Sequence, residues 1–97
     1  MGTILFSLYE ESYEPTEMSL GTRLERRRRE LGLSLEDVSE KTRIVIPYLE
    51  NIDRDEFHRL PGLPYSRGFV QSYASCVGLD TDTVVEQFNS EVGLGAS

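Results

Sequence analysis

The chain has 97 residues, of which 38% are hydrophobic and 28% are charged, a composition typical of one small globular domain rather than of a disordered chain. It contains no apolar run of roughly 18 residues, which excludes a membrane-spanning helix within it, and its single cysteine excludes an internal disulfide. Asp and Glu outnumber Lys and Arg by 17 to 10, giving a net charge of −7, so nucleic-acid binding would require basic residues gathered on one face.

Residues 1–18 are expected to form a flexible acidic tail. Pro15 disfavours a helix there, and the charged side chains of this segment are all acidic: Glu10, Glu11, Glu14 and Glu17. We therefore expect one folded domain over residues 19–92, followed by a short flexible tail over residues 93–97.

The first two predicted helices follow this tail. Apolar residues recur at steps of three and four from Leu20 onward, which predicts a helix that stops at Gly32. Ser34 is a suitable N-cap for a second helix, in which Asp37 lies near the positive end of the helix dipole and which ends near Thr42.

Three further helices complete the predicted fold. A third spans about residues 46–53, with Pro47 in its first turn, where a missing N–H costs little. Two prolines and a glycine make residues 57–64 a connector, and a fourth helix runs from about residue 64 to 77. A fifth begins near Asp80. No segment alternates with the period of a strand, so the prediction is an all-α, five-helix bundle.

The second and third helices, with their short link, match a helix-turn-helix of the repressor type. Apolar and small residues have the spacing that packs these two helices against a third: Val38, Thr42, Ile44, Leu49 and Ile52.

A wider pattern resembles the cytoplasmic N-terminal helix-turn-helix domain of the RodZ family, over roughly residues 19–90. The resemblance rests on these segments: Leu20-Gly21-Thr22-Arg23-Leu24, Gly32-Leu33-Ser34-Leu35, Tyr48-Leu49-Glu50, Leu60-Pro61, Tyr65-Ser66-Arg67-Gly68-Phe69 and Gly78-Leu79-Asp80.

This resemblance implies a bacterial cell-shape protein whose domain faces the cytoplasm and binds MreB, an actin-like filament protein. It implies that the filament contact lies on the fourth helix, at Tyr65 and Phe69. RodZ-like proteins usually continue into a transmembrane helix, so the chain is expected to be a fragment or a truncated relative. In a longer protein the domain would lie at the cytoplasmic face of the inner membrane.

The residues themselves leave two interpretations of the aromatic pair open. An aromatic stripe on a helix is more often part of the core. However, Val70, Tyr73 and neighbouring residues already supply an inward face, which leaves Tyr65 and Phe69 at its edge as candidate interface anchors. Arg67 is a candidate rim contact beside them, or alternatively a cap on the connector.

DNA binding by a transcriptional regulator is the alternative function. The third helix would then enter the major groove, with four candidate contacts: Arg43, Tyr48, Asn51 and Arg54. Only some of these side chains can read base edges, and nearby acidic residues, including Asp53, would repel phosphates.

The basic run over residues 26–29 spreads around all sides of the first helix, so it is expected to be a solvated, ion-paired surface. Contact with a phosphate or with anionic lipid is the alternative. Within this run, the repressor-like pattern implies a buried structural pair between Arg28 and Glu50. Arg27 departs from the small residue usual in the RodZ pattern, which leaves the packing there open.

Catalysis and metal binding are not predicted. His58 is the one histidine and Cys76 the one cysteine, too few ligands for a metal site and no evident pair for nucleophilic chemistry. No phosphate-binding loop is present, so we expect no cofactor and a non-catalytic binding module.

Overall fold

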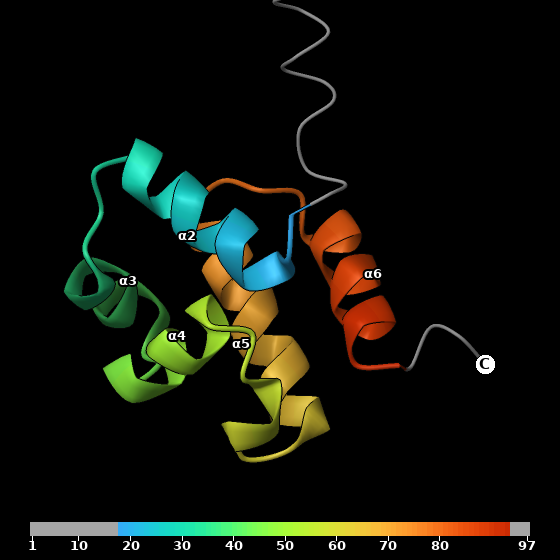
Figure 1. Cartoon of the computed structure of the whole chain (residues 1–97). Helices are drawn as coiled ribbons and strands as arrows, with labels where there is room; N and C mark the ends of the chain where they lie inside the picture. The colour runs from blue at the N-terminus through green and yellow to red at the C-terminus, as the bar shows by residue number, and fades with distance from the viewer. Residues whose placement is uncertain (1–17, 94–97) are drawn as a thin grey trace, which may run out of the picture.

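The computed structural model describes residues 18–93, which form five α-helices and one short 3-10 helix (Figure 1). The predicted all-α, five-helix fold is confirmed, and no strand occurs within these residues. Apart from Met18 and Gly93, the two predicted tails lie outside the described residues. In chain order the elements are α2 (Leu20–Glu30), α3 (Leu35–Thr42), α4 (Ile46–Asp53), η2 (Phe57–Arg59), α5 (Leu63–Cys76) and α6 (Thr81–Glu91).

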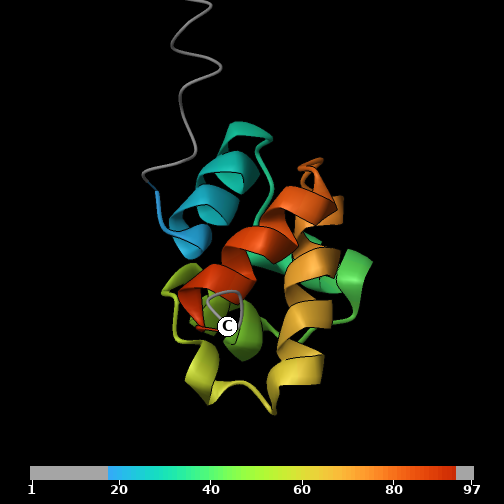
Figure 2. The ribbon, with the colours of Figure 1, turned by 90° about the vertical axis from the view of Figure 1, so that its right-hand side faces the viewer.

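The longest helix, α5, forms the centre of the arrangement. It packs against α6 along one side and against α3 along another, while α2 lies across α4 and α6 (Figures 1 and 2). Each helix therefore packs one side against at least one neighbouring helix. That side must be apolar, which accounts for the amphipathic spacing in the sequence.

One continuous apolar core joins these helices. Burying a large apolar side chain contributes roughly 1.5–3 kcal/mol to folding. All five α-helices, and the residue that follows α5, supply core side chains that have no exposed surface: Leu20, Leu24, Val38, Leu49, Ile52, Val70, Tyr73, Ala74, Val77, Val84 and Phe88.

The helix starts follow the capping chemistry expected from the sequence. The Ser34 side chain accepts a hydrogen bond from the Asp37 backbone N–H, and the Asp37 side chain accepts one from the Ser34 backbone N–H, which makes a complete capping box for α3. Asp80 caps α6 by accepting from the Thr83 backbone N–H. These side chains satisfy backbone donors that the helices themselves leave unpaired.

The connector before α5 contains more structure than predicted. A single 3-10 turn, Phe57–Arg59, places Phe57 in the core, and α5 begins at Leu63, with Pro64 in its first turn. Gly62 precedes it with φ of 152°, a conformation that residues with a Cβ rarely adopt. The glycine and proline therefore fix where the helix starts rather than preventing one.

The contact between α2 and α4 depends on a glycine. Gly21 is buried, and a Cβ built on it would overlap the backbone carbonyl oxygens of Ile52 and Asp53. The two helices approach closely here because no side chain stands between them.

Candidate functional site

The helix-turn-helix is formed by α3 and α4 with a tightly bonded link. The Ser39 hydroxyl donates to the Ile44 carbonyl oxygen at 2.6 Å, and the Thr42 hydroxyl accepts from the Ile44 N–H at 3.2 Å. Arg43 ends α3 in the left-handed conformation, with φ of 65°. These contacts fix the direction in which α4 leaves the turn.

The outer face of α4 carries few groups suited to reading DNA. Arg54 is exposed and Asn51 is half-buried, but Glu50 and Pro47 are also exposed on this helix. A carboxylate on the reading face repels phosphates, and proline offers no side-chain hydrogen bond. Arg43 is exposed at the preceding turn, so it is free to contact a phosphate.

Aromatic rings form a row from α4 to the start of α5. Tyr65 is 63% exposed, and its ring centroid lies 6.5 Å from that of Phe69. Phe69 is half-buried and stacks on Tyr48 of α4, with centroids 5.6 Å apart and planes inclined by 23°. The structure thus brings together two residues predicted for protein docking and one predicted for DNA contact.

Arg67 does not join this row. It is exposed, but residues two apart on an α-helix point about 200° away from one another. Arg67 therefore projects from the other side of α5 relative to both Tyr65 and Phe69. The geometry does not support its predicted role as a neighbouring rim contact.

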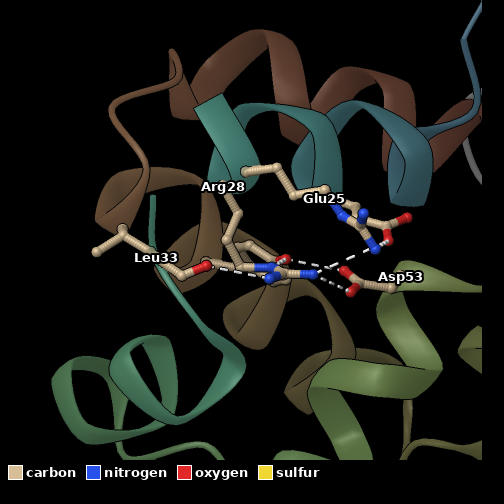
Figure 3. A network of polar contacts seen from close by, with 6 residues as sticks. Glu25, Arg28, Leu33 and Asp53 are labelled. Atoms are coloured by element: carbon tan, nitrogen blue, oxygen red, sulfur yellow. Dashed lines mark hydrogen bonds and ion pairs between the residues drawn. The ribbon is translucent and has the colours of Figure 1, made fainter. Parts of the chain in front are cut away.

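Arg28 lies in a buried polar network that joins α2, α4 and α5 (Figure 3). Its Nη2 donates to Asp53 Oδ2 at 3.0 Å, and its Nε donates to the Tyr73 hydroxyl at 2.9 Å. That hydroxyl donates in turn to Asp53 Oδ1 at 2.8 Å, and Arg28 Nη1 donates to the Leu33 carbonyl oxygen. The two charged side chains are only 9% and 11% exposed.

The predicted partner of Arg28, Glu50, is therefore wrong. Glu50 lies one turn earlier on α4 and is exposed, whereas Asp53 follows Leu49 by four residues and so shares the side of α4 that faces the core. The Asp53 carboxylate is held by Arg28 and Tyr73 in this network. It therefore does not present the free, phosphate-repelling negative charge that the sequence predicted.

Burial sets the protonation of the network. It raises the pKa of the Asp53 carboxyl, against the opposing effects of the Tyr73 hydrogen bond and the Arg28 charge. It also raises the pKa of the Tyr73 hydroxyl far above its ordinary value, so the hydroxyl keeps its proton and remains a donor to Asp53.

The structure shows how Arg27 packs, a point that the sequence left open. Its Nε donates to the Val77 carbonyl oxygen at 3.1 Å, at the C-terminal end of α5, and its guanidinium pairs with Glu30 at 3.3 Å. A cation is favourable beside the last carbonyls of a helix. The arginine thus ties the end of α5 to α2.

The remaining candidates are isolated from one another. His58 is exposed in η2, and Cys76 is a half-buried free thiol at the end of α5. Within residues 18–93, His, Cys, Asp and Glu side chains nowhere gather in threes as a metal site requires. Among these same residues, no helix has the length and apolar character needed to cross a bilayer.

Comparison with known proteins supports the helix-turn-helix formed by α3 and α4. Residues 23–84 match the family described as "Helix-turn-helix domain". The cytoskeleton protein RodZ of Streptococcus pneumoniae is 39% identical over 59 residues, which are 61% of this chain and 21% of that protein. The Bacillus subtilis membrane protein YmfM, itself uncharacterised, is 33% identical over 60 residues, 62% of this chain and 21% of its own length.

A solved structure supports the fold at higher coverage. YmfM of Staphylococcus aureus, a membrane protein for which DNA binding has been suggested, superimposes with a TM-score of 0.72 at 32% identity. The match covers 76% of this chain and 90% of the solved one. The chain spans about a fifth of the length of the curated relatives it matches. The chain therefore belongs to this helix-turn-helix domain family, and its helix-turn-helix domain is RodZ-like.

Proposed function

We propose that this domain is a non-catalytic docking module that binds the actin-like filament protein MreB through Tyr65 and Phe69, at the start of α5. The proposal draws on the likeness to a RodZ that is named as a cytoskeleton protein. The proposal places the domain in the cytoplasm. If the full-length protein carries a membrane anchor, the domain would lie at the inner face of that membrane.

The observation that carries the proposal is the exposed ring of Tyr65. A tyrosine that is 63% exposed contributes little to the core, whereas other residues already fill the inward side of α5: Ser66, Val70, Tyr73 and Ala74. Tyrosines placed in this way are frequent anchors of protein interfaces. Covering such a ring on docking contributes roughly 1.5–3 kcal/mol.

DNA binding through α4 is the second candidate, and the S. aureus relative for which it has been suggested favours it. Arg43, in the turn before α4, and Arg54, directly after α4, are both exposed and could contact phosphates. Against this, the exposed Glu50 lies between them, and the chain carries a net charge of −7.

Co-sedimentation with purified MreB filaments tests the proposal. We expect the wild-type domain to sediment with the filaments and Tyr65→Ala to lose most of that binding while its helical circular dichroism stays unchanged. Two exposed positions serve as controls: Arg67→Ala, on the other side of α5, and Leu31→Ala, at the C-terminal end of α2. Both should bind as the wild type does.

Binding to mixed-sequence duplex DNA at increasing salt separates the two candidates. Useful affinity near 0.1 M salt that falls steeply as salt rises would indicate phosphate contacts. That result, together with no sedimentation on filaments, would replace docking by DNA binding. Equal binding of the wild type and Tyr65→Ala to filaments would overturn the proposed site.

A further inference from the structure

We infer that Tyr48 is a third contact residue of the docking surface, so that this surface spans two helices and includes one flank of α4. The inference rests on the proposed function, because it extends the surface formed by Tyr65 and Phe69. It adds a residue from the helix-turn-helix itself to the set that binds the filament protein.

The stacking of the rings makes the surface continuous. Tyr48 and Phe69 are both half-buried, and the 5.6 Å separation of their ring centroids leaves no gap between α4 and α5 at this point. Tyr65 follows at 6.5 Å from Phe69. A partner that covers Phe69 from the solvent side therefore also meets the neighbouring rings of Tyr48 and Tyr65.

The hydroxyl of Tyr48 supports a contact role. Within residues 18–93 neither Tyr48 nor Tyr65 makes a side-chain hydrogen bond, whereas the buried Tyr73 hydroxyl both accepts from Arg28 and donates to Asp53. A tyrosine whose ring is packed and whose hydroxyl is unpaired can offer a hydrogen bond without moving its ring. The surface suits a protein with an apolar hollow rimmed by carbonyl or carboxylate oxygens.

This placement has a consequence for DNA. Tyr48 is on the helix that enters the major groove in DNA-binding relatives of this fold, but its ring is turned onto Phe69. A protein seated on the row covers that flank of α4. Docking on this row would therefore compete with DNA reading by α4.

Tyr48→Phe is the critical variant, because it keeps the stacked ring and removes only the hydroxyl. We expect it to weaken filament binding about twofold to tenfold, the range for one hydrogen bond. Tyr48→Ala should weaken binding more than tenfold, as for an interface anchor. Tyr73→Phe is the matched control: it removes a hydroxyl from the core, so it should lower the melting temperature and leave binding by the folded protein unchanged.

A second measurement does not depend on lost affinity. The chain has no tryptophan, so Tyr48→Trp introduces one fluorescent reporter at the site and Leu31→Trp introduces one away from it. With the filament signal subtracted, the Tyr48→Trp emission should shift to shorter wavelength when filaments are added, and the Leu31→Trp emission should not.

The outcomes separate the two claims. If Tyr65→Ala abolishes binding while Tyr48→Phe and Tyr48→Ala bind normally and the tryptophan signal is unchanged, the docking function stands and the inference about Tyr48 is overturned. If the wild type fails to sediment with filaments, both are overturned. If sedimentation equilibrium shows that the domain dimerises and Tyr48→Ala makes it monomeric, the surface joins two copies, which also overturns the inference.

Discussion

At the scale of single residues, the Tyr73 hydroxyl is the centre of the buried polar network. It links the Arg28 guanidinium to the Asp53 carboxylate, and all three side chains are largely removed from water. Buried ions are tolerated only when hydrogen bonds satisfy them. The three side chains also come from α2, α4 and α5, so the network fixes how these helices meet.

Replacing Tyr73 by Phe should therefore destabilise the domain by about 1–3 kcal/mol, because one donor to Asp53 and one acceptor for Arg28 are lost without a substitute. Urea unfolding followed by circular dichroism measures the change. Tyr48→Phe is the control, since the Tyr48 hydroxyl has no partner within residues 18–93, and it should unfold as the wild type does. Equal stability of Tyr73→Phe and the wild type would show that the Tyr73 hydroxyl contributes no net stability to the network.

The sequence allowed part of this network to be predicted. Arg28 was expected to be a buried structural residue, and it is 8% exposed. Its partner could not be taken from a family pattern, because Glu50 and Asp53 lie one turn apart on the same helix. The available signal was helical phase: Asp53 lies four residues after the buried Leu49, which puts these two residues on one side of α4.

Among the helices, α2 approaches the backbone of α4 closely at Gly21. The Gly21 N–H also donates to Asp55 Oδ1 at 2.8 Å. Asp55 adopts a positive φ of 60°, a conformation that aspartate accepts more readily than most residues. The turn after α4 is therefore tied to the first turn of α2.

Gly21→Ala should separate these two helices. The added methyl group meets backbone oxygens of α4, which cannot move aside as a side chain would, and overpacking of this kind costs about 1–3 kcal/mol. The melting temperature should fall although alanine is the better helix former. Arg29→Ala, at an exposed position of the same helix, supplies the control. A Gly21→Ala protein that melts at or above the wild-type temperature would contradict the close approach.

Helix starts were predictable because capping chemistry is local. Ser34, Asp37 and Asp80 mark them in the sequence, and the structure has the corresponding hydrogen bonds. Contacts between helices were not predictable in the same way. The stack of Tyr48 on Phe69 depends on the angle between α4 and α5, which no spacing within either helix specifies.

At the scale of the whole molecule, α6 closes the bundle. It packs along α5 and reaches back to α2 (Figure 2). There Glu91 accepts from the Leu20 N–H and Gln87 accepts from Arg23. The Phe88 ring meets Phe57 edge to face, with centroids 5.3 Å apart. The family match ends at residue 84, yet the core continues beyond it.

This arrangement makes α6 a required part of the domain. A chain shortened to residues 18–79 loses Val84 and Phe88, both with no exposed surface, at roughly 1.5–3 kcal/mol for each, and uncovers one side of α5. For a domain of this size, losses of that order consume most of the net stability. Thermal unfolding of this chain should be broad and non-cooperative, whereas a chain of residues 18–93 should keep one sharp transition. A sharp transition in the 18–79 chain would mean that α2 to α5 form a complete fold and that α6 is an appendage.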